Sequence, residues 1–469
     1  MLTAVRAQRI LTMADHCPAR QTPCESDHLP SFPVSGTPAR AVRTTTATSP
    51  GCHAAPVPAM LHDGVVVARD DCDGRGSRIE AVLPYTEFRA RYALTAQDLG
   101  PVTLLPGLIN CHTHLELSHL GGMAVFGHGF ERWIGSLLSH MNTPAQPAVL
   151  DAALNAAFKQ MTACGTAHAA DVTGRAPAAV YRAACRHDVE VDLQMEVFGY
   201  DFLQSSTPEH IWDMVWSWSD ALPADGTHSD SAHATAPDTA DGLHGAGTAR
   251  DAFFLSAAAR KRHGLLAGHS LYSTRADALV LAKQWCRSHE RHFSLHLAEH
   301  PGEEELLVHG TGLLRDMLGH RVLPPDFHAP GLRPVPYATE LGLLDEHTLA
   351  VHCVQCTGSD IALLCESGAS VCLCPRSNAL IGVGQAPVPA FLEAGLPLCL
   401  GTDSLASNHD LSLWNEARAL RDTHMISPDI LLRMLTIGGA HALGIADRLG
   451  TLEPGKLFRY AVLPDDFSF

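Results

Sequence analysis

Residues 106–116 of the 469-residue chain, PGLINCHTHLE, decide the fold. The apolar run from Val102 to Ile109 predicts a buried strand, and His112 and His114 follow it one residue apart. Residues i and i+2 of an extended strand point to the same side, so both imidazoles can face one point. A metal ion needs this arrangement for its first two nitrogen ligands. The alternative is a strand end that carries two ordinary polar histidines.

Three polar residues farther along the chain each close an apolar, strand-like run in the same way. They are His296, His352 and Asp403. Barrel enzymes build their sites from side chains at the carboxyl ends of their strands. The complete set therefore favours a metal site over an ordinary strand end.

Short apolar runs alternate with longer amphipathic ones between Leu104 and Gly444. The eight predicted strands are residues 104–112, 166–173, 189–198, 265–273, 292–298, 349–354, 369–374 and 397–402. Strand–helix alternation implies parallel pairing, and eight units imply a closed (β/α)8 barrel. An open doubly wound sheet is the alternative. It is disfavoured because no Gly-x-Gly-x-x-Gly follows the first strand.

Four motifs resemble those of the amidohydrolase superfamily, in its branch of aromatic-amine deaminases and chlorohydrolases. They are residues 105–114 (LPGLINCHTH), 296–299 (HLAE), 351–354 (VHCV) and 401–404 (GTDS). They occur in the family's chain order. Within the branch, residues 374–378 (CPRSN) and 404–408 (SLASN) look most like aminodeoxyfutalosine deaminases of menaquinone synthesis.

The resemblance implies a barrel with a small β-sandwich beside it, built from the N- and C-terminal segments. The expected parts are residues 1–103 as the N-terminal part of the sandwich, 104–447 as the barrel and 448–469 as the return to the sandwich. Residues 1–13 predict a short pair of strands, and the early end of the chain favours an abbreviated sandwich. Two segments, about 14–59 and about 222–250, are rich in small and polar residues and lack apolar periodicity. We expect them to be a flexible insertion and a loop insertion.

By the resemblance, one divalent metal ion, Zn²⁺ or Fe²⁺, is held by His112, His114, His296 and Asp403. Three nitrogens and one carboxylate suit either ion, whereas calcium and magnesium prefer more oxygens. Such an ion lowers the pKa of a water molecule toward neutrality and so makes it a nucleophile. The binuclear version of the superfamily uses a carboxylated lysine. The predicted third and fourth strands contain no lysine, which favours a single ion.

Three residues are expected to act in catalysis: Glu299, His352 and Asp403. In the resembling deaminases, a glutamate at the position of Glu299 carries a proton from the water to a ring nitrogen. The equivalent of His352 hydrogen-bonds the water or the substrate, and that of Asp403 accepts a proton from the water. The alternative for Glu299 is a place in the acidic cluster 303–305 at a helix start, which carboxylates favour. Catalysis is the stronger interpretation because that cluster explains the helix start without Glu299.

Four further positions are expected to shape the substrate pocket: Glu116, His269, Arg376 and Ser404. His269 matches a substrate-contacting histidine of the family, and Ser404 belongs to the fourth motif. Glu116 could meet a polar substrate group or the N-terminal dipole of a helix. Arg376 is the clearest cation for the benzoate of aminodeoxyfutalosine, because arginine can hold a carboxylate through two parallel hydrogen bonds. A solvated surface arginine is the alternative.

The formal net charge of −17 at pH 7 disfavours nucleic acid and anionic membranes as partners. No apolar run approaches the roughly 18–20 residues of a membrane span, and the first residues lack the apolar core of a signal peptide. Several of the 14 cysteines lie inside predicted strands, where free thiols behave as small hydrophobes, so a reduced cytoplasm is the expected location. The expected partners are a nucleoside-like small molecule and water, and a homodimer is possible.

The sequence therefore predicts a metal-dependent hydrolytic deaminase that acts on an adenine-type ring and releases ammonia. The resemblance makes 6-amino-6-deoxyfutalosine the leading substrate. Deamination of adenosylhomocysteine, methylthioadenosine or guanine, and dechlorination of a triazine, remain open within the same branch. The alternative outside enzymes is an inactive amidohydrolase-like binding protein. The presence of every expected metal ligand and both proton-transfer residues argues against it.

Overall fold

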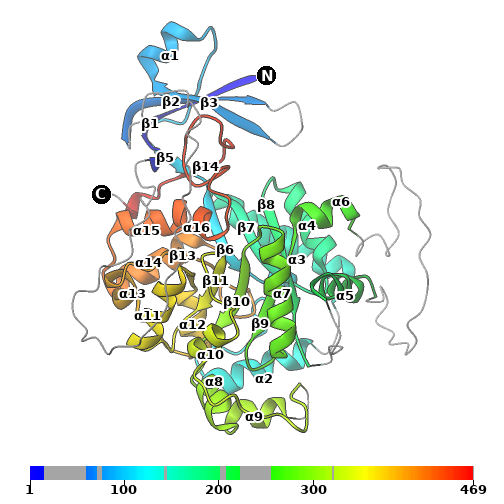
Figure 1. The fold of residues 1–469 in the computed structure, drawn as a ribbon. Coiled ribbons are helices and arrows are strands. Elements are labelled where there is room, and N and C mark those ends of the chain that lie inside the picture. The colour runs from blue at the N-terminus through cyan, green and yellow to red at the C-terminus, as the bar shows by residue number, and fades with distance from the viewer. Residues whose placement is uncertain are drawn as a thin grey trace, which may run out of the picture.

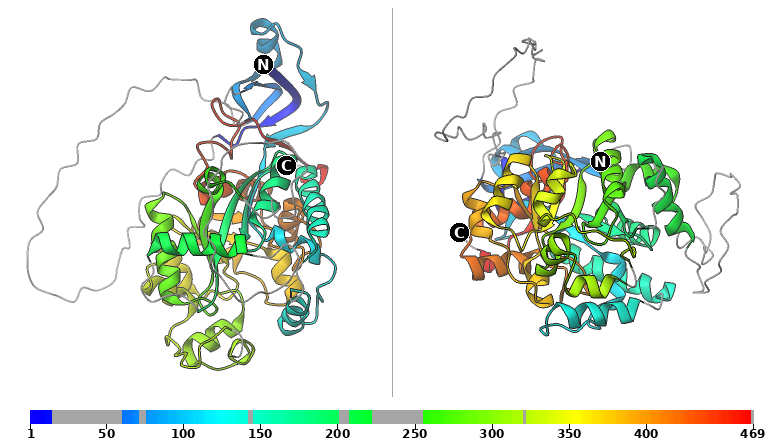
Figure 2. Two further views of the ribbon diagram at one scale, coloured as in Figure 1. Left: turned by 90° about the vertical axis from the view of Figure 1, so that its right-hand side faces the viewer. Right: turned by 60° about the horizontal axis from the view of Figure 1, so that its bottom comes forward.

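The computed structural model describes residues 1–14, 60–70, 76–141, 145–200, 207–221, 255–319 and 322–467. They form a barrel of parallel strands surrounded by helices, with a smaller sheet at one end (Figure 1). Figure 2 shows the same arrangement from two further directions. The predicted insertions, about 14–59 and about 222–250, lie outside the described residues except for residue 14. None of the described helices combines the length and apolar character that crossing a membrane requires.

Eight parallel strands, each hydrogen-bonded to its neighbour in chain order, form the barrel and confirm the predicted fold. They are β6 (Leu108–Thr113), β7 (Thr166–Thr173), β8 (Glu190–Val197), β9 (Gly264–Ser270), β10 (Phe293–Leu297), β11 (Thr348–His352), β12 (Ser370–Leu373) and β13 (Leu398–Leu400). Nearly all of their residues are buried. Strands buried on both faces tend to read as continuous apolar runs, as β9 and β13 do, whereas β8 (EVDLQMEV) alternates polar and apolar residues.

The helices between the strands cover the outside and the two ends of the barrel (Figure 1). Several begin with proline, which suits a first helical turn because its φ is already fixed and its missing N–H would have no helical partner. The helices are α2 (Phe130–Met141), α3 (Pro147–Ala163), α4 (Pro177–Arg186), α5 (Pro208–Ala221), α6 (Ala257–His263), α7 (Ala276–Ser288), α8 (Pro301–Glu304), α9 (Leu313–Leu318), α10 (Pro334–Glu340), α11 (Gly358–Ser367), α12 (Pro375–Ile381), α13 (Val388–Glu393), α14 (Leu413–His424), α15 (Pro428–Leu435) and α16 (Ile437–Ala442). Short 3-10 or π turns occupy η2 (Leu115–Leu120), η4 (Glu305–His309) and η5 (Asp465–Phe467).

The predicted first strand, residues 104–112, is in fact two strands. β5 (Thr103–Pro106) belongs to the smaller sheet, and β6 begins the barrel. Gly107 separates them, and a Cβ at this position would lie 2.5 Å from the Ala167 Cβ. Only glycine, which has no Cβ, lets the backbone come this close to Ala167. The chain passes from the smaller sheet to the barrel at this position.

The smaller sheet has six strands. They are β1 (Leu2–Leu11), β2 (Met60–Asp70), β3 (Ser77–Pro84), β4 (Gln97–Asp98), β5 and β14 (Tyr460–Val462). The expected pair of short strands in residues 1–13 is wrong, because β1 runs without a turn and pairs antiparallel with β2 along its length. The partner of this segment lies some fifty residues away, so local alternation could not reveal it.

Both faces of the smaller sheet are covered. Val65 and Val67 pack with Phe88 of α1 (Tyr85–Arg91) on one face. Val66 points the other way and packs with Leu452 from the C-terminal segment. β14 then pairs antiparallel with β5, so both ends of the chain contribute to this unit.

The barrel closes where β13 meets β6. The His112 carbonyl oxygen accepts hydrogen bonds from the backbone N–H groups of Thr402 and Asp403, at 3.1 and 3.0 Å. The Asn110 side chain reinforces this seam, because its amide donates to Thr402 Oγ1 at 2.8 Å and its oxygen accepts from Thr402 N at 3.1 Å. Two of the predicted metal ligands therefore lie at the seam of the barrel.

Candidate active site

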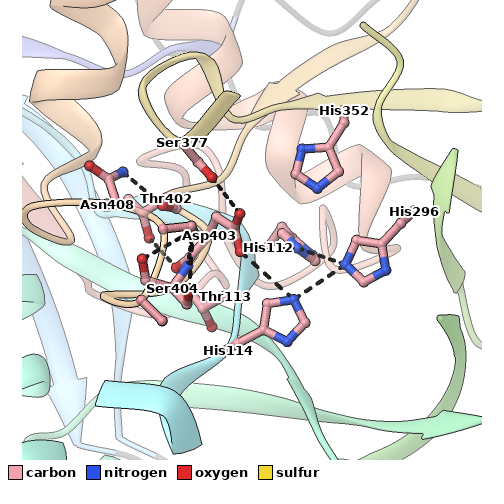
Figure 3. A network of polar contacts seen from close by, with 12 residues as sticks. His112, Thr113, His114, His296, His352, Ser377, Thr402, Asp403, Ser404 and Asn408 are labelled. Carbon is pink, nitrogen blue, oxygen red and sulfur yellow. Dashed lines mark hydrogen bonds and ion pairs between the residues drawn. The ribbon is translucent and has the colours of Figure 1, made fainter. Parts of the chain in front are cut away.

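The carboxyl ends of three barrel strands bring the predicted metal ligands together (Figure 3). His112 is in β6 and His114 follows it, His296 is in β10, and Asp403 follows β13. His352, the last residue of β11, faces the same group, with its ring centroid 5.5 Å from that of His296. Because all of these strands run parallel, residues far apart in the chain meet at one end of the barrel.

The spacing of the four ligand side chains fits a tetrahedral ion. His114 Nε2 and His112 Nε2 lie 3.2 and 3.3 Å from His296 Nε2. Asp403 Oδ1 lies 3.8 Å from His112 Nε2 and 3.7 Å from His114 Nε2. Zinc bound at about 2.0–2.1 Å separates its tetrahedral ligands by about 3.3 Å. The two distances to His296 Nε2 match this spacing, and Asp403 Oδ1 lies slightly farther from His112 and His114.

Hydrogen bonds to the atoms that face away from the site orient two of the predicted ligands, His296 and Asp403. His296 Nδ1 lies 2.7 Å from the His269 carbonyl oxygen, to which it can only donate, so Nε2 carries the free lone pair. Ser377 Oγ donates to Asp403 Oδ2 at 2.6 Å, which leaves Oδ1 facing the histidines. Partners of this kind support the ligands of metal centres.

The three histidines of this cluster are neutral near pH 7. Burial lowers the pKa of His114 and His296 to about 4, and it lowers the pKa of His112 well below its ordinary value. The neighbouring histidines lower all three pKa values further. Neutral imidazole is the form that binds metals. The cluster can therefore accept a divalent cation without first losing protons.

We expect zinc binding at this cluster to persist at mildly acidic pH. Protons and a metal ion compete for the same Nε2 lone pairs, and a pKa of about 4 lets protons compete only as the pH falls toward that value. Zinc content after dialysis should be the same at about pH 7 and about pH 5.5, and should fall near pH 4. Exposed histidines, with pKa values near 6.5, would already release zinc at about pH 5.5. That outcome would contradict a buried site.

Left-handed backbone marks three of these strand ends. φ is +50° at Ala298, +74° at His352 and +57° at Asp403. Residues other than glycine rarely adopt this region, at a cost of roughly 1–2 kcal/mol each. Such backbone outliers cluster at active sites, where the surrounding structure holds them in place. Their occurrence here supports a functional role for this end of the barrel.

Glu299 and His352 face each other beside the predicted metal ligands. Glu299 Oε1 lies 3.4 Å from His352 Nε2. Burial, and then the charge of Asp403, raise the pKa of Glu299 to about 8, so the carboxyl group holds a proton at neutral pH. His352 Nδ1 lies 2.9 Å from Asn378 Oδ1, while burial lowers the pKa of His352. The pair therefore combines a proton donor with a neutral imidazole.

The helix-start role considered for Glu299 is filled by Glu303. The Glu303 carboxylate accepts hydrogen bonds from the backbone N–H groups of Ala298, Glu299 and His300, at 3.1, 2.7 and 3.0 Å. Together with the His300 side chain it forms the capping box of α8. The Glu299 side chain is not required there and is directed toward His352.

Glu116 binds the start of a helix. Its Oε2 accepts hydrogen bonds from Thr173 Oγ1 at 2.7 Å and from the backbone N–H groups of Gly174, Arg175 and Ala176, at 3.2, 2.8 and 3.0 Å. These residues lead into α4, so the geometry matches the helix-dipole alternative for this carboxylate.

His269 and Ser404 lie beside the metal ligands. The His269 ring centroid is 5.1 Å from that of His296, and its Nδ1 lies 2.5 Å from Ser273 Oγ. Ser404 directly follows Asp403, and its hydroxyl lies 3.1 Å from Ser407 Oγ. Both positions are compatible with the predicted contact to a substrate.

Arg376 departs from its expected role as a free cation for a substrate. Its guanidinium forms a bidentate ion pair with Asp410, in which Nη1 and Nη2 donate to Oδ1 and Oδ2 at 2.7 and 2.9 Å. Nη1 also lies 3.5 Å from Glu416 Oε1. A substrate carboxylate would have to displace Asp410 from this pair. The side chain is also mostly buried, which rules out the solvated surface arginine considered as its alternative. The geometry favours a structural role that joins α12 to the loop before α14.

Comparison with known proteins agrees with this geometry. Residues 103–468 match the amidohydrolase family. The chain belongs to the amidohydrolase family. The resemblance predicted from the four motifs is thereby confirmed, and with it the expectation of a hydrolase built on a (β/α)8 barrel.

Two curated relatives and one solved structure illustrate the likeness of this amidohydrolase to known proteins. A 5-methylthioadenosine/S-adenosylhomocysteine deaminase of Nitratidesulfovibrio vulgaris is 27% identical over 426 residues, which cover 85% of this chain and 82% of that protein. An aminodeoxyfutalosine deaminase of Deinococcus radiodurans is 26% identical over 384 residues, covering 79% and 80%. The crystal structure of a zinc-bound adenosine deaminase from Xanthomonas campestris superposes with a TM-score of 0.66 at 20% identity, covering 98% and 84%.

Sequence reasoning missed one carboxyl group at the site of this amidohydrolase. Glu196 in β8 places an oxygen within 4.8 Å of ring nitrogens of His269 and His296. A second ion there would compete for His296, whose Nε2 already faces the first site, so the two positions cannot both be filled. Glu196 Oε1 is buried and has no hydrogen-bond partner among the described residues, and burial raises the pKa of Glu196 to about 8. The position of Glu196 near the carboxyl end of the predicted strand 189–198 was the signal that could have revealed it, although Glu190 and Asp192 of the same strand are acidic too.

Proposed function

We propose that this amidohydrolase is a metal-dependent hydrolytic deaminase of adenine-type rings. The observation that carries the proposal is the placement of Glu299, protonated and buried, beside three neutral histidines and the Asp403 carboxylate. Hydrolytic deamination needs a nucleophilic water on one side of the reacting carbon and a proton for the ring nitrogen. The site offers groups for both tasks within a few ångströms.

His112, His114, His296 and Asp403 would hold one Zn²⁺ or Fe²⁺ ion. When bound, the ion would supply Lewis acidity that makes a water molecule nucleophilic near neutral pH. The Asp403 carboxylate, which Ser377 Oγ holds through a hydrogen bond to Oδ2, would take the proton from this water and pass it to the amino group that leaves as ammonia. The zinc in the Xanthomonas campestris deaminase supports this choice of metal.

Glu299 would deliver a proton to the ring nitrogen next to the reacting carbon. Attack at an aromatic amidine carbon is productive only if that nitrogen is protonated. With a pKa of about 8, Glu299 holds a proton at neutral pH and can donate it without a large penalty. His352 Nε2, 3.4 Å from Glu299, would hydrogen-bond the water or the substrate from the same side.

The leading substrate is 6-amino-6-deoxyfutalosine, followed by methylthioadenosine and adenosylhomocysteine. The motifs at residues 374–378 and 404–408 and the Deinococcus radiodurans relative support the first, and the Nitratidesulfovibrio vulgaris relative supports the others. We further infer a cytoplasmic location, supported by the absence of disulfides among the described cysteines.

A substrate panel tests the proposal. Zinc-loaded protein is incubated with 6-amino-6-deoxyfutalosine, methylthioadenosine, adenosylhomocysteine, adenosine, guanine and a chlorotriazine. Ammonia and the loss of purine absorbance are measured for the purines, and chloride release is measured for the triazine. We expect ammonia from at least one adenine nucleoside. An Asp403→Asn protein purified identically controls for contaminating deaminases. Binding of nucleosides without ammonia release would support the inactive binding protein instead, and activity on the triazine alone would support a chlorohydrolase.

A further inference from the structure

Asp171 is a buried carboxyl group that has no part in the chemistry proposed above. It lies in β7, where it is completely buried and stands opposite Thr113 of β6 in the sheet. Carboxyl groups are seldom fully buried unless they are paired or hydrogen-bonded. The hydrogen bonds of Asp171 therefore indicate what it does.

Asp171 holds the chain on both sides of His114. Its Oδ1 accepts a hydrogen bond from the backbone N–H of Leu115 at 2.6 Å and from Thr113 Oγ1 at 3.0 Å. Thr113 precedes the metal ligand and Leu115 follows it. One oxygen atom thus binds both neighbours of His114 while leaving its imidazole free.

His114 needs such support because it lies outside regular structure. β6 ends at Thr113 and the turn η2 begins at Leu115, and the pairing of β6 with β7 shifts register between Asn110 and Thr113. His114 itself has φ −127° and ψ 74°, which is neither helix nor regular strand. Its neighbour His112, in contrast, lies within the strand and is fixed by the closed barrel.

We propose that Asp171 is a positioning residue that fixes His114 for metal binding. Through Thr113 and Leu115 it sets the path of the backbone where the chain leaves β6. The backbone path in turn sets the direction in which the His114 ring points toward the proposed metal site, which His296 and Asp403 also face. The inference rests on the metal site proposed above, but it assigns a role to a residue outside the ligand set.

Zinc affinity tests this role independently of catalysis. Full-length holoprotein is titrated with a chelating zinc indicator, and thermal unfolding is followed in parallel. Asp171→Ala removes both hydrogen bonds and should weaken zinc binding by about 10–100-fold, the usual cost of losing a group that supports a ligand. Asp171→Asn keeps an acceptor oxygen in the same place and should lose less than about tenfold. Thr113→Val removes one of the two bonds to Asp171, together with the contact of the Thr113 hydroxyl with the Ala170 carbonyl oxygen at 3.2 Å, and its zinc affinity should lie between those of the two Asp171 variants.

Asp360→Ala is the matched control. Asp360 is also a buried aspartate, 1% exposed, and it accepts hydrogen bonds from the backbone N–H and hydroxyl of Thr357, at 2.8 and 2.7 Å. It flanks no metal ligand. This variant should lower the unfolding temperature without changing zinc affinity, as expected of a purely structural aspartate.

Each outcome separates the alternatives. Unchanged zinc affinity in Asp171→Ala, or an equal loss in Asp171→Asn and Asp171→Ala, would overturn the positioning role. If Asp171→Ala does not fold, wild-type zinc affinity in Thr113→Val would overturn it. If the wild-type protein itself binds neither zinc nor ferrous iron, the metal site fails and with it the proposed function.

Discussion

The His296→Ala protein is expected to purify without its metal ion and without activity. His296 Nε2 lies 3.3 and 3.2 Å from the other two ligand nitrogens, so its removal opens one corner of the proposed site. Loss of a supporting group already costs about 10–100-fold in metal affinity or activity, and loss of a direct ligand should exceed 100-fold. Elemental analysis of the purified protein and kcat/KM for the best substrate measure the two effects.

His292→Ala is the matched control for this experiment. His292 lies just before β10, at the opposite end of the strand that carries His296, and its Nε2 lies 2.8 Å from Gln194 Nε2. Its replacement should destabilise the barrel while leaving zinc content intact. A wild-type zinc content in His296→Ala would exclude the metal assignment, whatever the activity of the variant.

Glu299→Gln should separate binding from chemistry. Glutamine keeps the size and polarity of the side chain but cannot donate the acidic proton that Glu299 holds at neutral pH. Zinc content and substrate binding should remain near wild type, and kcat should fall by about 10²–10⁴-fold, the usual contribution of general acid–base catalysis. An unchanged kcat would remove Glu299 from the proposed mechanism.

Glu303→Gln provides the comparison. Glu303 is four residues away, and burial likewise raises its pKa to about 8. Its carboxylate is occupied by backbone N–H groups, and an amide oxygen can still accept from some of them. This variant should have a lower free energy of unfolding than wild type, whereas its kcat should fall by less than about tenfold. A fall in kcat as large as that of Glu299→Gln would mean that the geometry of the loop, and not proton transfer, limits the reaction.

The barrel and the meeting of several polar residues at one end of it could be predicted because both follow from short-range patterns. Apolar runs mark the buried strands, and a polar residue at the end of such a run must lie at the carboxyl face if the strands are parallel. His296, His352 and Asp403 were assigned in this way, and the structure brings all three to one point.

The partners of individual charged side chains could not be predicted in the same way. Arg376 pairs with Asp410, which is 34 positions away, and Glu116 binds the N–H of Ala176, 60 positions away. Each pairing depends on how the loops fold back over the barrel, and no local pattern carries that information. The role of Asp171 could not be predicted for the same reason. Its position in the predicted strand 166–173 does not indicate the contact with Leu115.

The seam between β6 and β13 has a consequence for how the protein is made. Asn110 and Thr402, which join across it, are 292 positions apart, so a ribosome adding about 5–20 residues per second needs about 15–60 s between them. Throughout that interval the nascent chain carries His112 and His114, the first two residues of the predicted ligand set, but lacks the Asp403 carboxylate that completes it. A metal ion that binds the finished site favours the folded state only once Asp403 has been added. Products truncated before the last barrel strand lack Asp403, so the proposed ion would stabilise them less than it stabilises the complete barrel.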